Sequence, residues 1–396
     1  MVGPFGLSPK GTMKVRALPL AKALSARGHH VTVLIPPWDD PSSSGLQWLE
    51  GGVWVINVKL PPKIPFLFHL LLCLRLVWRA VGLRPDVVHL FKPKAFAGLT
   101  HVVLWWARRL GLLSAAVRLV VDEDDWERAW NDISPYSVFQ KAFFRWQEVW
   151  GLRHADSLTV ASEYLAVLVQ EEGISSDVTF YVPNGWRDIR QGNRATRPEA
   201  VRMLWELDEA QTILLYSRFV EFRLERILNV VRLLASRAPT SRLMIVGEGL
   251  HGEEAHLDDM LTRSGLSPYA VFTGWVPAEQ MPDYFAAVDL ALFPYDDTLV
   301  NRTKCSVRLV DMLAAGVPVV ADAVGQNTAY IESGENGVLV PAEDDAAMVA
   351  EVVRLLEDAD LRHRLGAGAA ARIRQDFDWG VLAQVAERAY EVSRNR

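Results

Sequence analysis

The sequence alternates short apolar runs, rich in β-branched residues, with longer segments of helical period. In the first half the predicted strands are residues 30–35, 53–58, 86–90, 117–121 and 157–161, and the helices between them include 15–26, 65–82 and 95–110. After residue 200 the pattern starts again, with predicted strands at 212–216, 242–246, 270–273, 290–294, 317–321 and 338–340. Such alternation is typical of parallel α/β units. We therefore predict an α/β fold of two doubly wound, Rossmann-like domains, with a cleft between the carboxyl ends of their sheets.

The chain length fits two such domains, because 396 residues exceed one ordinary α/β core. We place the N-terminal domain at residues 1–190 and the C-terminal domain at 191–379. The join is predicted within 183–198, a stretch with four arginines and little apolar content. Only residues 1–3 precede the first loop, so we expect either an unusually short first strand or a sequence that begins inside it.

The composition indicates a globular cytoplasmic protein. Half of the residues are apolar and 23% are charged, which excludes a disordered chain. Cys73 and Cys305 lie 232 positions apart, so they form neither a disulfide framework nor a zinc pattern, and a reducing compartment is expected. The N-terminus lacks the basic segment and apolar run of a signal peptide.

Charge is unevenly distributed along the chain. Residues 1–118 hold 15 Lys/Arg and four Asp/Glu, whereas the remaining 278 hold 27 and 44. The net charge of −6 therefore combines a basic part of +11 with an acidic part of −17. This asymmetry favours an anionic partner for the basic part, and a solvated basic surface without a partner is the alternative.

Residues 64–81, IPFLFHLLLCLRLVWRAV, form the most membrane-like segment. His69, Arg75 and Arg79 interrupt the run of about 20 apolar residues that a spanning helix needs, so we do not expect it to cross a membrane. We expect it to lie in the interface plane with its arginines reaching the headgroups, so that residues 1–118 contact an anionic membrane surface. The alternative is an ordinary domain helix.

Two arginines mark the start of the second α/β set. The predicted strand 212–216 ends at Ser217 and Arg218, and Arg223 follows where a helix should begin. Two guanidiniums at the mouth of a parallel sheet suit a diphosphate, because each makes planar, charge-assisted contacts to phosphate oxygens. Taken alone, each arginine also fits a surface ion pair.

Two later elements complete this group. The strand 242–246 ends at Gly247, Glu248 and Gly249, where glycine lets the backbone approach a ligand. Residues 308–320 read as a buried helix followed by a core strand, and Asp311 lies one turn before the end of that helix. Its carboxylate suits two ribose hydroxyls, and a solvated helix face is the alternative.

In order and spacing, these residues resemble the family-4 group of retaining glycosyltransferases of GT-B fold. The family's G-R-L…K, V-G-x-G, L-E-A-M-A-x-G-x-P-V-V, V-P-N-G and F-S-W motifs correspond to residues 217–223, 246–249, 310–320, 182–185 and 377–379. The resemblance covers nearly the whole chain, with Arg223 in place of the usual lysine. It also implies that a closing helix, at about 380–396, joins the N-terminal domain.

The resemblance implies a role for each residue of the donor site. Arg218 and Arg223 would neutralise the diphosphate leaving group, Asp311 would bind the ribose, and the loop with Gly274, Trp275 and Val276 would cradle the base. The resemblance implies no metal and no cofactor beyond a nucleoside-diphosphate sugar as co-substrate, because the two cations and a helix N-terminus stabilise the developing charge.

One departure concerns the transferred sugar. The family often has an acidic residue eight positions before the one at 311, but Thr303 stands there. We therefore expect Thr303, Lys304 or Ser306 to meet the diphosphate or the sugar.

The first half supplies further candidates. The loop of residues 3–12, GPFGLSPKGT, resembles the family's glycine-rich first loop, which would place Gly11 and Thr12 beside the donor phosphate; a plain strand–helix turn is the alternative. The acidic run 122–125 follows a predicted strand, where many relatives have a histidine. Neighbouring carboxylates raise one another's pKa, which would suit Asp122 or Asp124 as a catalytic group. The alternative is a solvated acidic loop.

Three residues follow or end the strand before this run. His89, Lys92 and Lys94 would either hold an anionic acceptor or balance the acidic run. Both interpretations stay open at this point.

These observations predict a metal-independent hexosyltransferase that moves a sugar from a nucleoside-diphosphate sugar to an acceptor with retention of configuration. The basic part suggests a glycan or lipid-linked acceptor at the cytoplasmic membrane face; we expect no nucleic acid partner. A nucleotide-sugar 2-epimerase and a catalytically silent glycosyltransferase-like partner subunit are the alternatives. The missing first carboxylate keeps the silent subunit open.

Overall fold

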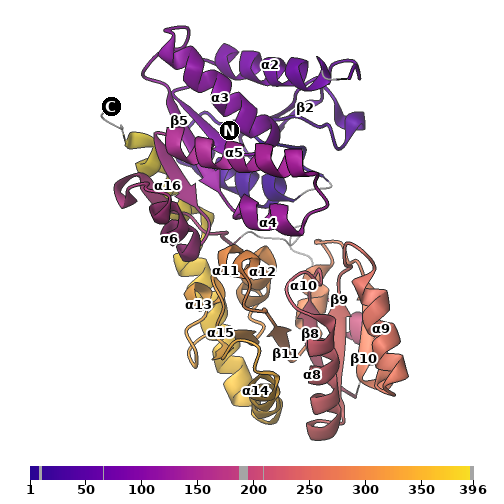
Figure 1. Ribbon diagram of the computed structural model, residues 1–396. Coiled ribbons are helices and arrows are strands. Elements are labelled where there is room, and N and C mark those ends of the chain that lie inside the picture. Colours follow the sequence, from indigo (N-terminus) through magenta and orange to yellow (C-terminus); the bar gives the residue numbers. More distant parts are fainter. Residues whose placement is uncertain (9–10, 66, 187–194, 208, 393–396) are drawn as a thin grey trace. The chain divides into compact units, whose positions relative to one another are not determined.

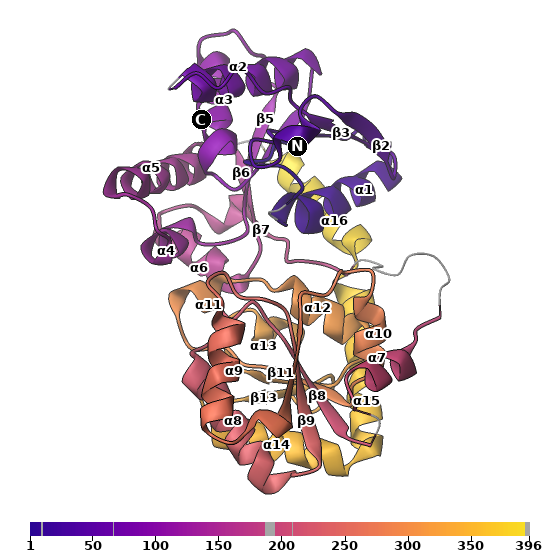
Figure 2. The same ribbon diagram turned by 90° about the vertical axis from the view of Figure 1, so that its right-hand side faces the viewer.

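The computed structural model describes residues 1–8, 11–65, 67–186, 195–207 and 209–392. The chain forms two compact units. The first comprises Met1–Gly185, Thr303–Cys305 and Trp379–Arg396, and the second comprises Trp186–Arg302 and Ser306–Asp378. Figures 1 and 2 show each unit as a sheet with helices around it. The predicted join, residues 183–198, lies partly outside the described residues, since 187–194 are among those left out.

The sheet of the first unit consists of two sets of strands, and Val2 pairs with one strand of each set. Its strands are β1 (Thr32–Ile35), β2 (Gln47–Glu50), β3 (Val53–Asn57), β4 (Val87–Phe91), β5 (Arg118–Glu123), β6 (Ser157–Val160) and β7 (Thr179–Tyr181). The orders are β1-β3-β2 and β4-β5-β6-β7, and Val2 makes parallel bridges to Leu34 and Leu90, one in each set. Among the described strands of this unit, only β2 runs antiparallel. The switch point of the winding therefore lies between the bridge residue Val2 and β4.

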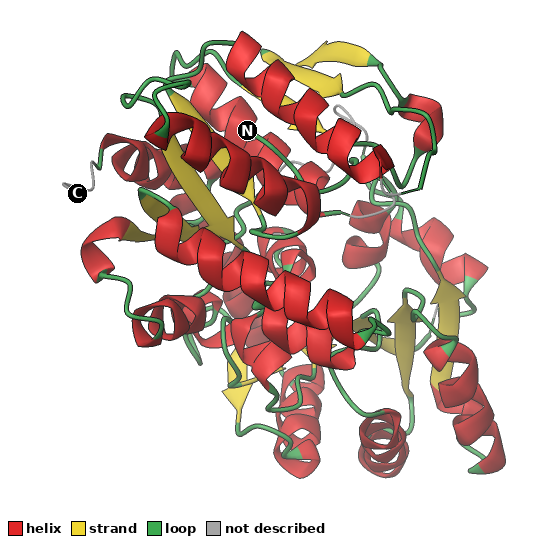
Figure 3. Ribbon diagram, turned by 45° about the horizontal axis from the view of Figure 1, so that its top comes forward, coloured by secondary structure: helices red, strands yellow, loops and turns green. Residues whose placement is uncertain are grey.

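Helices cover this sheet. A π-helix, Met13–Ala17, runs into α1 (Leu18–Ala26), and the others are α2 (Leu67–Gly82), α3 (Ala95–Arg109), α4 (Glu127–Ile133), α5 (Val138–His154), α6 (Glu163–Glu171) and α16 (Trp379–Glu391), with short 3-10 turns at Pro41–Ser43 and Ser176–Val178. Neighbouring helices α2, α3 and α5 form one layer (Figures 1 and 3), while α16 packs on α1 and on β5 to β7. None of the described helices combines the length and apolarity that a membrane crossing requires.

The second unit has a six-stranded, fully parallel sheet. Its strands are β8 (Gln211–Tyr216), β9 (Ser241–Val246), β10 (Ala270–Gly274), β11 (Leu290–Phe293), β12 (Val319–Asp322) and β13 (Val338–Val340), in the order β10-β9-β8-β11-β12-β13. The winding reverses between β8 and β11, and open α/β sheets bind ligands at such a point. The α/β fold with two Rossmann-like units is thus confirmed.

The remaining helices belong mainly to this unit. They are α7 (Pro198–Leu204), α8 (Leu224–Arg237), α9 (Glu253–Arg263), α10 (Met281–Ala286), α11 (Leu299–Thr303), α12 (Val307–Ala314), α13 (Asn327–Tyr330), α14 (Asp345–Glu357) and α15 (Ala359–Asp376), with a 3-10 turn at Ser267–Tyr269. Its central strands are buried along their length because helices cover both faces, which is why they read as continuous apolar runs in the sequence.

Candidate functional site

The loop after β8 presents Arg218 at the switch point of the second unit. The Arg218 side chain is exposed, and no group of the described residues forms a hydrogen bond or ion pair with it. The next residue, Phe219, is buried with φ +63°, a left-handed conformation that a bulky residue adopts only when its surroundings impose it. The hydroxyl of Ser217 accepts a hydrogen bond from the Phe219 N–H at 2.8 Å. This loop is therefore fixed around a guanidinium that is available to a ligand.

Glu221 ties this loop to the segments that follow β11. Its carboxylate accepts a hydrogen bond from Ser217 Oγ at 2.8 Å and pairs with Arg308 on α12. Its carbonyl oxygen accepts from Asn301 Nδ2 at 2.6 Å. Burial lowers the pKa of Arg308, but the Glu221 carboxylate together with Tyr295, Tyr216 and Asp311 outweighs burial and raises the pKa above its usual value. Sequence reasoning missed this pair, although an acid three residues after Arg218 was a usable signal.

Arg223 lies at the N-cap of α8, as predicted, but it already has acidic partners. Its Nε is 3.1 Å from Asp296 Oδ2, and its Nη2 is 2.6 Å from Glu343 Oε2. The side chain remains 68% exposed. A diphosphate would therefore have to compete with two carboxylates for Arg223, whereas Arg218 carries no such competitor among the described residues.

The ends of β9 and β10 are joined through Glu248. Its Oε1 accepts a hydrogen bond from the N–H of Trp275 at 3.2 Å, and the N–H of Gly247 donates to the carbonyl of Gly274 at 2.9 Å. Gly247 has φ +121°, and a Cβ there would lie 2.0 Å from the carbonyl oxygen of Ser217, so only glycine fits. Trp275 is exposed, and the next residue, Val276, is buried. Glu248 thus acts by holding the loop that would meet the base.

The helix α12 places Ser306 and Asp311. Ser306 is the buried N-cap residue, and Asp311 is a buried residue on the second turn. Thr303 and Lys304 belong instead to the short segment Thr303–Cys305, which groups with the first unit. Thr303 is buried and Lys304 is half-buried. In the second unit, the residues that lie around the carboxyl ends of the strands are therefore Arg218, Arg223, the loops 247–248 and 274–276, Ser306 and Asp311.

In the first unit, Gly11 and Thr12 lie at the N-terminus of the first helix. The carbonyl of Gly11 accepts hydrogen bonds from the N–H groups of Lys14 and Val15, both at 2.9 Å, and Thr12 is the N-cap. Both residues follow the strand at Val2, beside the switch point of this sheet. Their position fits the expected approach of a phosphate, but a plain strand–helix turn has the same geometry.

Asp122 is part of the core and not of the sheet edge. It pairs in bidentate fashion with Arg16, with contacts of 2.7 and 2.6 Å, and both side chains are buried. Thr159 Oγ1 donates to it at 2.6 Å. The sequence prediction ended the strand at residue 121, whereas β5 runs to Glu123. The catalytic role predicted for Asp122 is therefore not supported by its position, and its ion pair with Arg16 gives it a structural role.

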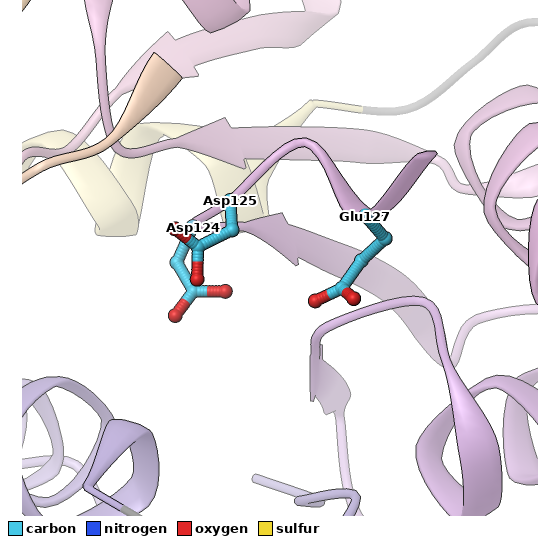
Figure 4. A group of neighbouring side chains, drawn as sticks. All are labelled: Asp124, Asp125 and Glu127. Atoms are coloured by element: carbon cyan, nitrogen blue, oxygen red, sulfur yellow. The ribbon is translucent and has the colours of Figure 1, made fainter. Parts of the chain in front are cut away.

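Asp124 follows the end of β5 and lies in a cluster of acids around Lys92. Figure 4 shows Asp124, Asp125 and Glu127 in the loop and at the start of α4. The Lys92 Nζ lies 3.0 Å from Asp124 Oδ1, 2.7 Å from Asp125 Oδ2 and 3.0 Å from Glu127 Oε1. Burial raises the pKa of Asp124 to about 7, against the opposing charge of Lys92. Asp124 is therefore a buried carboxyl poised to exchange a proton near neutral pH.

The same three acids are the one group in the described residues whose oxygens lie close enough together to hold a metal ion. The Lys92 ammonium makes contacts to all three of them. Burial lowers the pKa of Lys92, but the three carboxylates outweigh it and raise the pKa well above its usual value. A permanent positive charge therefore already occupies the position between these oxygens, and the residues do not fit a metal centre.

Lys94 and His89 also have internal partners. Lys94 Nζ donates to Glu127 Oε2 at 2.7 Å and to Asn131 Oδ1 at 3.0 Å. His89 is buried, with its ring nitrogens 2.9 Å from Tyr390 Oη and 3.0 Å from Thr159 Oγ1, and burial lowers its pKa to about 3. The acceptor-binding role predicted for His89, Lys92 and Lys94 is thus not what the geometry favours. The two lysines balance the acids, and the neutral histidine belongs to the core.

Glu123 is a further buried acid that sequence reasoning did not single out. It is fully buried, and neither of its carboxyl oxygens has a hydrogen-bond partner among the described residues. Burial, together with repulsion from Glu148, Glu127 and Asp124, raises its pKa well above the usual value. Because consecutive strand residues point to opposite faces, Glu123 lies on the other face of β5 from Asp122.

Two family models match the chain. The model described as "Glycosyl transferases group 1" matches residues 210–358, and the model described as "Glycosyl transferase 4-like domain" matches residues 11–185. The match over residues 11–185 falls within the first unit, and the match over 210–358 falls within the second unit except for Thr303–Cys305; together they span most of the chain.

Curated relatives match nearly the full length. A phosphatidyl-myo-inositol mannosyltransferase of Mycobacterium leprae is 26% identical over 99% of this chain and 96% of its own length. A GDP-mannose-dependent alpha-mannosyltransferase of Mycobacterium tuberculosis is 27% identical over 93% of this chain and 90% of its own.

Solved structures share the fold. A sucrose-phosphate synthase from Thermosynechococcus elongatus superposes with a TM-score of 0.73 at 20% identity, covering 98% of both chains. HepE from Anabaena, in complex with UDP and glucose, superposes with a TM-score of 0.71 at 19% identity, covering 98% of this chain and 97% of that one.

Proposed function

Because the chain belongs to the group 1, family-4 glycosyltransferases of GT-B fold, and is therefore an enzyme of sugar transfer, we propose that it moves a sugar from a nucleoside-diphosphate sugar to an acceptor with retention of anomeric configuration. The observation that carries the proposal is Arg218, an exposed guanidinium on a strained loop at the β8/β11 switch point. Neither the family models nor the relatives reported above support the epimerase alternative.

In this proposal the second unit binds the donor. Arg218 contacts the diphosphate, and Arg223 joins it when Glu343 is displaced. Asp311 accepts hydrogen bonds from the ribose, and the loop of residues 274–276, which Glu248 holds in place, surrounds the base. Charge that develops on the leaving diphosphate is stabilised by these two guanidiniums, which make planar, charge-assisted contacts to phosphate oxygens.

The reaction would proceed on the front face of the sugar. The bond between the anomeric carbon and the diphosphate oxygen breaks as the acceptor oxygen forms its bond on the same face. The acceptor's proton passes to the departing diphosphate. Asp124, with a pKa raised to about 7 by burial, is the group of the first unit that would stabilise the positive charge on the sugar ring when ionised.

We propose that no metal takes part in the transfer. Two guanidiniums in the second unit supply the positive charge that a divalent ion would otherwise bring to a diphosphate. In the first unit the acids Asp124, Asp125 and Glu127 already surround the Lys92 ammonium. The test is donor turnover in excess chelator.

We further propose a glycan or lipid-linked acceptor at a membrane surface on the cytoplasmic side. The basic charge of residues 1–118 supports an anionic partner. The M. leprae relative's name specifies a phosphatidyl-inositol, which is a lipid of this kind. The helix α2, in which His69, Arg75 and Arg79 interrupt a largely apolar segment, is the part of residues 1–118 suited to the contact.

The test uses the purified full-length protein with UDP-, GDP-, ADP- and TDP-sugars and measures diphosphate release. The variant Arg218→Ala should lose at least 100-fold in kcat/KM, about 3 kcal/mol of transition-state stabilisation, with an unchanged melting temperature. The matched control is Arg263→Ala, an exposed arginine at the carboxyl end of α9, which should keep full turnover. Unchanged turnover in Arg218→Ala removes that residue from the site; no turnover of any donor, with or without lipid acceptors, favours the silent subunit.

A further inference from the structure

The outer layer of the first unit exposes an unusual number of aromatic side chains. Its helices α2, α3 and α5 lie side by side on one face of the sheet, as Figures 1 and 3 show. On α5, Phe139 is 88% exposed and Trp146 is 45% exposed, with Phe143 between them on the same face at helical spacing. Single exposed apolar residues are normal, but a contiguous group marks an interaction surface.

The aromatic group continues from α5 onto α3. The rings of Phe143 and Trp146 stack at 5.8 Å, and Trp150 follows at 6.3 Å from Trp146. Trp150 meets Trp105 of α3 at 5.7 Å, and Trp105 in turn contacts Trp106, which is 53% exposed. We call the set Phe139, Phe143, Trp146, Trp150, Trp105 and Trp106 the aromatic face.

The same three helices carry almost no negative charge. They contain no aspartate and a single glutamate, Glu148, which is fully buried. Arg108 and Arg153 of these helices pair with Asp156 and Glu172, respectively. Their other basic residues are Arg75, Arg79, Arg109, Lys141 and Arg145. The layer therefore combines apolar rings with positive charge and presents no carboxylate to a partner.

We propose that the aromatic face anchors the first unit to a bilayer that contains anionic lipids. Tryptophan rings favour the interface between headgroups and acyl chains, because one edge is apolar and the other donates a hydrogen bond. Lysine and arginine side chains lie along an apolar surface while their charged ends reach phosphates. The exposed leucines and Trp78 of α2, in the same layer, extend the surface that would lie on the bilayer.

A second copy of the chain fits this surface less well. A symmetric dimer through the aromatic face would set the same patch against itself. The basic residues of one copy would then meet those of the other with no exposed carboxylate from these helices to pair with them, which opposes association. An anionic bilayer supplies the missing negative charge.

The proposed membrane contact thereby extends to residues beyond 1–118. It rests on the proposed function only in one respect, because a membrane-bound acceptor is the reason for the contact. Binding to a bilayer is measured without donor or acceptor. Its failure is therefore distinguishable from a failure of sugar transfer.

The experiment is flotation of the full-length protein with vesicles of phosphatidylcholine, with or without 30 mol% phosphatidylglycerol. We expect the protein to float with the anionic vesicles at low salt and less as salt rises. The variant Phe139→Ser/Phe143→Ser/Trp146→Ser should bind at least tenfold less. The matched control, Met203→Ser/Leu204→Ser, removes two exposed apolar side chains from α7 of the second unit and should bind as the parent does.

A second variant keeps the test independent of folding defects. Lys141→Glu/Arg145→Glu leaves the rings in place and should lose binding to anionic vesicles only. Melting temperatures of all variants are measured alongside. Parent protein that does not float, or a triple variant that floats like the parent, overturns the proposal. So does a parent that is dimeric by light scattering and becomes monomeric in the triple variant, because the face would then join two copies.

Discussion

The acidic cluster around Lys92 makes a specific prediction for the pH dependence of catalysis. If Asp124 must be ionised for transfer, kcat/KM should rise with pH through about 7, the value to which burial raises the pKa of this carboxyl. The charge of Lys92 opposes the increase in the pKa of Asp124. Replacing Lys92 by methionine removes this positive charge, while burial and the neighbouring acids remain. The rising limb should therefore move to higher pH in Lys92→Met.

The size of the shift follows from the geometry. The Lys92 Nζ lies 3.0 Å from Asp124 Oδ1. Coulomb's law with an effective dielectric constant of about 20 gives roughly 5 kcal/mol at this separation, or about 4 pKa units, as an upper bound. Water entry and relaxation reduce this value, and opposite charges at such distances shift carboxyl pKa values in proteins by about 1–3 units. We expect the rising limb of the pH profile of Lys92→Met to move to higher pH by that amount.

The stability of the first unit should show the same linkage. A carboxyl whose folded pKa is raised contributes stability that is fully present below its unfolded pKa, near 3.8 for Asp124, and is lost as pH rises through about 7. In Lys92→Met the loss should extend to higher pH. Melting curves between pH 5 and pH 9 report on this independently of turnover.

The assay is diphosphate release at subsaturating donor between pH 5 and pH 9. Lys92→Arg, which keeps the charge, is the matched control. Its rising limb should lie within about half a pH unit of the parental limb, which is small beside the shift of about 1–3 units expected for Lys92→Met. A folded Lys92→Met protein with the parental limb would refute the argument, because Asp124 would then not be the group that titrates. A limb that disappears together with all activity would show that Lys92 has a further role.

Two further predictions concern other ion pairs. Arg16→Met leaves the buried Asp122 carboxylate without its partner and should lower the free energy of unfolding by about 3–5 kcal/mol, seen by calorimetry as a fall in melting temperature of roughly 10 °C. The added change Asp122→Asn should restore most of this stability. A fall below about 2 °C in Arg16→Met would count against the pair. Glu343→Gln should release Arg223 and lower the donor KM by about two- to fivefold at constant kcat, since an exposed pair is worth up to about 1 kcal/mol; a raised KM would mean that Glu343 itself binds the donor.

Most strands could be predicted from the sequence because helices bury them on both faces. β8 and β9, for example, begin one residue before their predicted starts and end where predicted. β2 was missed because it is a half-exposed antiparallel edge strand without a continuous apolar run. The pair Gly51-Gly52, both at positive φ, joins β2 to β3, and such a pair is a known signal for a two-residue hairpin turn.

The donor site could be predicted to the level of position but not of partners. Motif spacing placed Arg218 and Glu248 at strand ends. An apolar run followed directly by arginine or glycine is a local pattern, so it can be recognised in the sequence. Arg223 and Glu343, in contrast, are 120 residues apart, and their ion pair depends on which loops the sheet order makes neighbours. No local pattern carries that information.

The assignment of the acidic run depends on where one strand ends. Asp and Glu are poor strand formers, so the sequence prediction stopped the strand at residue 121 and placed Asp122 at the sheet edge. β5 continues to Glu123 because Arg16, from the first helix, supplies the charge that allows Asp122 to be buried between Phe91 and Thr159 in the strand pairing. This extension of two residues moves the sheet edge to Asp124. Asp124 is therefore the residue just beyond the strand, where burial raises its pKa to about 7 while the charge of Lys92 opposes the increase.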